Sequence, residues 1–170
     1  MSRRPLIPLA AALLLGGAGA AAPEPLETRG AWRLVADDQD FALRTQAIDA
    51  PDSTLSLHCR KAQTIFAFEI KSPTLAARPS GEDIRIGFKV DGDDRVWLTL
   101  ASGPGGTVPI THQTAFWIIH AALTHNGAKG VGFTAGDQTW QFALDGLSDL
   151  TGSLTVRCEF EPPRSLPVSR

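Results

Sequence analysis

The stretch Thr54-Leu55-Ser56-Leu57-His58-Cys59-Arg60 (residues 54–60) carries an apolar side chain at every second position. Leu55, Leu57 and Cys59 fall on one face of an extended chain, while the serine and the histidine between them fall on the other. This alternation predicts a β-strand with one buried face. The same period recurs over residues 84–88, so a sheet that buries one face is expected.

Further runs rich in β-branched and aromatic residues are separated by clusters of Gly, Pro, Asp and Asn. The predicted strands are residues 32–36, 41–47, 54–60, 64–71, 84–90, 95–101, 129–133, 140–144 and 154–160. So many short strands predict antiparallel pairing in a mainly β fold, a single β-sandwich or β-barrel-like domain. Asp91-Gly92 is a turn signal between two of the runs, which predicts that these two strands form a hairpin.

One segment has helical spacing instead of alternation. Apolar residues within residues 114–124 recur three and four positions apart, and Asn126-Gly127 supplies residues that often end a helix. We therefore expect one α-helix there, although the apolar run over residues 115–119 also fits a buried strand. A shorter helical turn is expected at residues 147–150, limited by Gly152.

The chain contains two cysteines, Cys59 on an early predicted strand and Cys158 on the last one. An even number of cysteines behind an export signal predicts a disulfide, which needs an oxidising compartment. Closing a loop of roughly 100 residues corresponds to about 4–5 kcal/mol of denatured-state entropy in the chain model. A redox-active pair is the alternative, but catalytic pairs usually have the closer spacing Cys-x-x-Cys.

The N-terminus has the features of an export signal. Arg3 and Arg4 precede a short apolar stretch over residues 6–15, and small residues around Ala20 provide a cleavage site. We expect a signal peptide over residues 1–20 and one β-rich domain over residues 21–170, in the periplasm or secreted. The arginine pair is compatible with Sec and with twin-arginine export. No cysteine lies at the cleavage region, so no membrane anchor is expected after cleavage.

The charge of the chain argues against nucleic acid as a partner. Without the two arginines of the expected signal, 14 of the 16 Lys and Arg residues remain against 18 Asp and Glu residues, a formal charge of 14 − 18 = −4. The basic residues are scattered, whereas binding to a phosphate backbone requires a clustered basic face.

No recognisable catalytic or metal-binding motif occurs in the sequence. The chain lacks Gly-x-Ser-x-Gly, and its Gly-rich stretch lacks the Lys and Ser/Thr of a phosphate-binding loop. His112, His120 and His125 lie in or beside the expected helix. The last two are five residues apart, about 500° of helical rotation, so they do not share a face. We expect no metal site and no cofactor.

Four tryptophans in a chain without tyrosine suggest a binding surface. Trp32 and Trp140 have aliphatic neighbours and are expected in the core. Trp97 is in phase with polar residues on its strand, so its ring is expected to face solvent, unless it packs beneath the Gly-rich loop at residues 102–106. The candidate partner contacts are Trp97, Asp91, Asp93, Asp94, Ser102, Gly103, Gly105 and Gly106.

Several short segments together resemble a known family. The Trp32 strand, the strand over residues 57–60, the hairpin over residues 86–97, the Phe116 helix and the run over residues 142–147 before Cys158 are similar to the layout of VasI-type accessory proteins of type VI secretion. That family tends to run a helix into its final cysteine, where this sequence favours a strand. The chain also resembles exported invasion-associated locus B proteins. Either resemblance implies a non-enzymatic envelope protein.

The leading hypothesis is therefore a periplasmic accessory or binding protein that acts through contacts with an envelope protein, without catalysis. A small periplasmic hydrolase with a site built from Asp and His is the first alternative. A periplasmic enzyme inhibitor that presents its Gly-rich loop is the second. A deep pocket collecting ionisable groups would favour an enzyme, and a shallow exposed apolar or aromatic patch would favour a binding protein.

Overall fold

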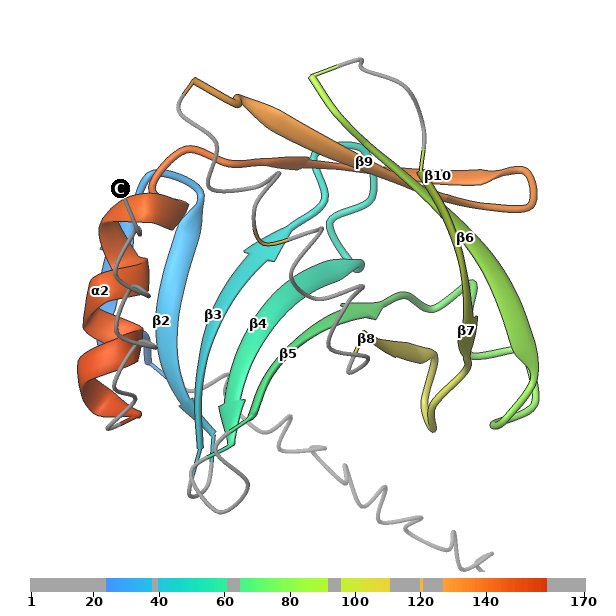
Figure 1. Cartoon of the computed structure of the whole chain (residues 1–170), viewed down its shortest axis with the longest axis horizontal. Helices are drawn as coiled ribbons and strands as arrows, with labels where there is room; N and C mark the ends of the chain where they lie inside the picture. Colours follow the sequence, from blue (N-terminus) through green and yellow to red (C-terminus); the bar gives the residue numbers. More distant parts are fainter. Residues whose placement is uncertain are drawn as a thin grey trace, which may run out of the picture.

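Figure 1 shows a computed structural model of the chain, which describes residues 24–37, 40–60, 65–91, 96–110, 120 and 127–158. The expected signal peptide lies outside these residues. So does the expected helix over residues 114–124, with the exception of His120. Two antiparallel sheets, one long helix and one disulfide make up the described part, which confirms the mainly β fold.

The larger sheet has six antiparallel strands in the order β1-β2-β3-β4-β5-β8. The smaller sheet has four antiparallel strands in the order β10-β9-β6-β7. In Figure 1 the smaller sheet arches over the upper and right-hand sides of the larger one, and the helix α2 lies beside β2 on the left. The strands are β1 (Glu27–Arg29), β2 (Trp32–Asp37), β3 (Asp40–Gln46), β4 (Thr54–Arg60), β5 (Ile65–Lys71), β6 (Asp83–Val90), β7 (Val96–Ala101), β8 (Thr107–Ile110), β9 (Gly130–Ala135) and β10 (Gln138–Ala143).

The core lies between the two sheets, as the alternation predicts. One ladder of directly paired residues crosses five strands of the larger sheet, and each of its members is buried: Leu34, Leu43, Leu57, Phe68 and Ile110. From the smaller sheet, Phe133 and Phe142 meet edge to face, with ring centroids 5.9 Å apart. Each fully buried side chain of this size contributes about 1.5–3 kcal/mol through the apolar surface it removes from water.

Most predicted strands are confirmed, and the predicted hairpin is the β6–β7 pair. Two strands were not predicted. β1 is three residues long and carries no apolar side chain, so it has no pattern to detect. β8 contains Pro109, and it lies at the edge of its sheet, where a residue without an N–H group is tolerated.

The prediction of a strand over residues 154–160 is wrong, because residues Leu147–Arg157 form the helix α2. The run Thr155-Val156-Arg157-Cys158, with two β-branched residues, favoured a strand. In the helix, Leu147, Leu150 and Leu154 form the buried stripe, and Val156 points to solvent with 78% of its surface exposed. The expected limit at Gly152 is wrong too, since the helix continues through this exposed residue.

The start of α2 is fixed against the β1–β2 turn. Gly146 is the residue that precedes the helix, and its φ of 86° is one that side-chain-bearing residues rarely adopt. A Cβ atom at this position would overlap the carbonyl of Arg29. The Ala31 N–H donates a hydrogen bond to the carbonyl of Asp145. The sequence therefore needs glycine here because two backbones pass in contact.

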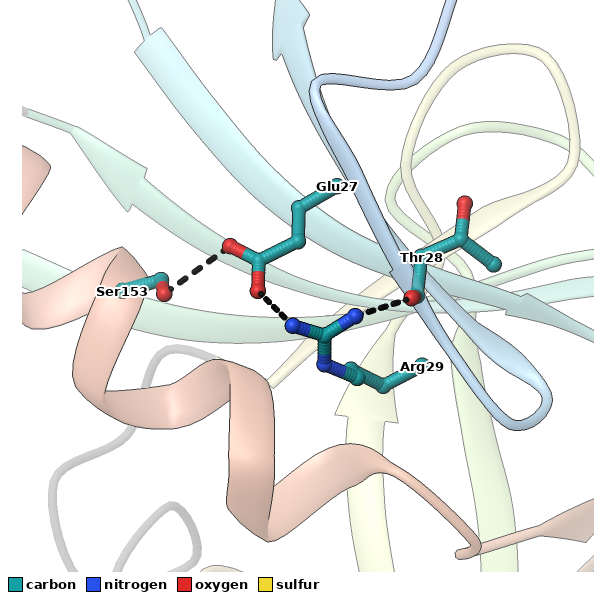
Figure 2. Close-up of polar contacts among 4 residues, drawn as sticks. All are labelled: Glu27, Thr28, Arg29 and Ser153. Carbon is teal, nitrogen blue, oxygen red and sulfur yellow. Dashed lines mark hydrogen bonds and ion pairs between the residues drawn. The ribbon is translucent and has the colours of Figure 1, made fainter.

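A polar contact joins the middle of α2 to the edge strand β1 (Figure 2). The Ser153 hydroxyl donates to Oε2 of Glu27 at 3.0 Å, and the other carboxylate oxygen pairs with the Arg29 guanidinium at 3.2 Å. Glu27 is directly opposite Leu34 in the β1–β2 pair and therefore projects toward the face that α2 covers. The helix thus covers the part of the inner face nearest β1.

The disulfide joins the C-terminal end of α2 to the larger sheet. Cys59 on β4 and Cys158, the residue that follows the helix, are bonded, and their Cα atoms lie 6.1 Å apart. This confirms the predicted bond, although Cys158 caps a helix and does not belong to a strand. Both residues are buried within the same core.

Candidate functional site

Trp97 is the most exposed aromatic side chain among the described residues. It lies on β7, the terminal strand of the smaller sheet, and 42% of its surface is accessible. Its neighbour Val96 is 40% exposed. Trp32 and Trp140, in contrast, are 0% and 2% exposed. The expectation that Trp97 faces solvent while Trp32 and Trp140 pack in the core is confirmed.

An arginine from the paired strand covers one side of the indole. Trp97 is directly opposite Gly87 of β6, and Arg85 lies two residues before that glycine on the same face. Because glycine has no side chain, position 87 leaves space beside the ring. The Arg85 guanidinium carbon lies 4.5 Å from the ring centroid, a cation–π contact. This contact favours one orientation of the exposed ring.

Arg85 was not among the predicted site residues. The signal that identifies it is the register of the hairpin, which places Arg85 diagonally across from Trp97 once the two strands are paired. The alternation of side chains along either strand alone does not reveal that Arg85 and Trp97 are in contact.

Asp91 has a structural role in the hairpin. Its carboxylate accepts hydrogen bonds from the backbone N–H groups of Lys129 at 2.9 Å and Gly130 at 2.8 Å. Its φ is 49°, in the left-handed region that Asp tolerates better than most residues. The side chain thus holds the start of β9 against the end of β6. Asp93 and Asp94 lie outside the described residues.

The Gly-rich stretch is a tight turn between β7 and β8. Ser102 is buried and donates from Oγ to the carbonyl of Pro79 at 2.6 Å. The Gly103 N–H donates to the carbonyl of Thr107 at 2.7 Å. Gly106 is buried, and its carbonyl accepts from the Ser72 N–H at 2.9 Å. Gly105 remains exposed at the tip.

The structure does not gather all the predicted contact residues in one place. Val96 pairs with Phe88 at the end of β7 next to Asp91, and Ala101 pairs with Asp83 at the end next to the Gly-rich turn. Six residues of strand separate these ends by about 17 Å. Trp97 lies near the first end. Among the described residues, the exposed surface around this ring consists of Trp97, Val96 and Arg85.

Histidines do not form a second candidate site in the described residues. His58 on β4 places Nε2 3.6 Å from Oε1 of Glu69, and this nitrogen is buried without a hydrogen bond. His120 is half-buried, and desolvation lowers its pKa. His112 and His125 lie outside the described part of the chain. Within that part, no three His, Cys, Asp or Glu side chains come close enough together to hold a metal ion.

No helix in the described ranges is both long and apolar enough to cross a bilayer. The chain matches no protein-family model, and comparisons with curated proteins and with solved structures found no similar protein.

Proposed function

We propose that the protein is an exported accessory or binding protein that acts through contact with an envelope protein and performs no catalysis. The observation that carries this proposal is the exposed Trp97 ring, held by Arg85 beside the exposed Val96. Tryptophan and arginine are the residue types most enriched at the energetic centres of protein interfaces. A ring that this contact already restrains loses less side-chain entropy when a partner covers it.

The strand that carries the ring also has a free edge. β7 is the last strand of its sheet, and within the described residues no strand is hydrogen-bonded to its outer side. Its sequence Val-Trp-Leu-Thr-Leu-Ala contains no charge and no proline, the features that usually protect an edge strand from pairing. An extended segment of the partner could pair with β7 and cover the indole at the same time.

Two further features support an exported accessory role. The buried disulfide fits an oxidising compartment. The helix α2 ends at Cys158, which resembles the helix before the final cysteine in VasI-type accessory proteins. The expected departure from that family at this point was a strand, and the strand is not present.

The hydrolase alternative is less well supported. The nearest described pairing of an acid with a histidine is Glu69 with His58, and the His58 Nε2 that would exchange a proton is buried. The inhibitor alternative relied on a protruding Gly-rich loop, but two residues of that loop, Ser102 and Gly106, are buried in a tight turn. We therefore favour a binding protein that contacts its partner through β7 over a hydrolase or an inhibitor.

The experiment is a photo-crosslinking assay on the folded protein. A photoreactive residue replaces Thr99, which is exposed on β7 two positions from Trp97, and the protein is exposed to envelope extract. We expect a discrete cross-linked product that Trp97→Ala removes. Val156→Ala is the matched control, because it truncates an exposed apolar side chain on α2, and it should leave the product unchanged.

Circular dichroism and thermal melting of each variant show whether it is folded. A cross-linked product that persists in folded Trp97→Ala protein would contradict the proposal. So would a variant that loses stability while its cross-linking per folded molecule stays unaltered.

A further inference from the structure

Of the four strands that end the two sheets in the described residues, three have features that oppose further strand pairing. β1 is only three residues long, and two of its side chains are charged. β8 contains Pro109, which has no N–H group to donate. The edge of β10 is bonded to the loop after β3. There the Ile48 N–H donates to the Gln141 carbonyl at 2.7 Å, and the Asp49 carboxylate accepts from the Gln141 N–H at 3.1 Å.

The fourth terminal strand, β7, has none of these features. It is six residues long, without charge or proline, and no described strand pairs with its outer side. Its apolar side chains are incompletely covered, since Val96 is 40% exposed and Leu98 and Leu100 are only half-buried. An uncharged edge of this kind is a template for pairing with another chain. It can also meet a copy of itself without bringing like charges together.

We propose that the protein forms a symmetric dimer in which β7 pairs antiparallel with β7 of a second copy. The dimer deepens the proposed function and rests on the same β7 surface, so the second copy and the envelope partner compete for it. Each copy uses this edge once, and the loop at residues 48–49 covers the other edge of the same sheet. Pairing therefore stops at two copies and forms a closed dimer with one continuous sheet.

The pleat limits the register of this pairing. Directly opposite residues of an antiparallel pair lie on the same face of the sheet, so the symmetry axis must pass through a residue and not between two residues. An axis at Leu98 places Leu98 opposite its own copy and Val96 opposite Leu100, which joins apolar side chains on the inner face. On the outer face it places Trp97 opposite Thr99. Pairs of an aromatic with a β-branched residue stabilise antiparallel sheets.

An axis at Thr99 is the other register that pairs five residues, and it fits less well. It places Trp97 opposite Ala101, which offers the indole a single methyl group. Ala101 also leads directly into the Gly-rich turn, where the Gly103 N–H bonds to the carbonyl of Thr107 at the start of β8. We therefore assign the axis to Leu98.

The strand partners of Trp97 leave room for its ring in this register. Within its own copy the ring lies beside Gly87, which has no side chain, and across the interface it lies beside the small Thr99 of the second copy. Arg85 is directly opposite Thr99 in each hairpin. The second copy thus brings another arginine into the row of the ring, in addition to the Arg85 that already contacts it.

The first test is sedimentation velocity of the purified protein from low to high micromolar concentration, where we expect a monomer–dimer equilibrium. Thr99→Glu should raise the dissociation constant about 10-fold or more, because two carboxylates then lie at diagonal positions across the axis. Within one copy the new carboxylate is opposite Arg85, which favours the folded monomer. Thr28→Glu is the matched control, since Thr28 is an exposed threonine on an edge strand, directly opposite the exposed Arg33. It should leave the dissociation constant unchanged.

Photo-crosslinking of the purified protein tests the register. A photoreactive residue in place of Thr99 should give a covalent dimer without any extract. Mass spectrometry of its peptides should locate the bond at or beside Trp97 of the second copy. A covalent dimer linked outside β7 would overturn the proposed pairing.

The dimer and the proposed function can fail separately. Protein that sediments as a monomer at every concentration overturns the dimer, as does a folded Thr99→Glu variant that dimerises like the unsubstituted protein. Neither result bears on a product formed with an envelope protein. If extract yields only the covalent dimer, the dimer stands and the proposed function fails. If both products form, the extract product should increase at the expense of the dimer, because both occupy β7.

Discussion

The Trp32 indole donates a hydrogen bond of 2.9 Å from Nε1 to the backbone carbonyl of Ala143. Trp32 begins β2 in the larger sheet, and Ala143 ends β10 in the smaller one. A single side chain, fully buried, therefore joins the two layers by a directed bond as well as by packing. This bond lies beside the turn where Gly146 approaches the backbone of Arg29.

Trp32→Phe should destabilise the fold more than Trp140→Phe. Both changes remove the same atoms from a buried ring, but only the first deprives a backbone carbonyl of its described side-chain donor. The unsatisfied carbonyl should add about 1–3 kcal/mol to the loss. Urea denaturation of the two variants measures the difference. Equal losses in the free energy of unfolding would mean that the Ala143 carbonyl accepts a hydrogen bond from water or from another donor.

The disulfide should contribute a large part of the stability. Its cysteines are 99 residues apart, for which the chain model gives about 4–5 kcal/mol. We expect Cys59→Ser with Cys158→Ser to lower the urea midpoint strongly, and hydrogen exchange to increase first in α2, which the bond fixes to β4. Mass spectrometry that found two free thiols in the isolated protein would contradict the assignment.

Asp91→Ala should destabilise the protein by about 1–3 kcal/mol, because two backbone N–H groups lose a charged acceptor. Asp91→Asn is the matched variant. It keeps an oxygen acceptor and tolerates the positive φ, so it should retain most of the stability. If Asp91 served only a partner, both variants would melt like the unsubstituted protein.

The contact between α2 and β1 shown in Figure 2 predicts a smaller effect. Ser153→Ala removes the donor to Glu27 and should cost about 1 kcal/mol. Ser148→Ala, an exposed serine on the same helix, should change the stability by less than about 0.5 kcal/mol. Thermal melting of the two variants measures the difference. Equal changes in stability would show that the hydrogen bond to Glu27 does not stabilise the protein.

Acidification should destabilise the protein through His120. Burial lowers the pKa of this residue in the folded state below the ordinary histidine value of about 6.5, so the unfolded chain binds the proton more readily. The stability contributed by neutral His120 is present above pH 6.5 and is lost as the pH falls through the lowered pKa. Urea midpoints at pH 7.5 and 5.5 should differ less in His120→Gln. An unchanged difference would assign the pH dependence to other groups.

Alternating patterns predicted the central strands well because the core faces one side of each sheet. The strand over residues 54–60 is reproduced residue for residue. The last element was misassigned because β-branched Thr155 and Val156, together with Gly152, disfavour a helix locally. Packing of Leu147, Leu150 and Leu154 into the core, together with the bond at Cys158, outweighs that preference.

The candidate surface could be predicted in part. Alternation placed Trp97 outward, but the Arg85 contact depends on strand pairing, and the burial of Ser102 depends on its bond to Pro79, which is 23 residues away in the chain. The parts of the candidate surface that the sequence did not predict therefore depend on contacts between residues far apart in the chain.

The position of α2 after all the described strands affects how the protein can fold during synthesis. The strands β1 to β5 are made first and can pair locally, but the helix that covers their inner face at β1–β3 follows about 80 residues later than β5. Until ribosomes release that segment, an apolar sheet surface and the thiol of Cys59 stay open. Nascent chains truncated before residue 147 should therefore bind chaperones that chains containing α2 escape.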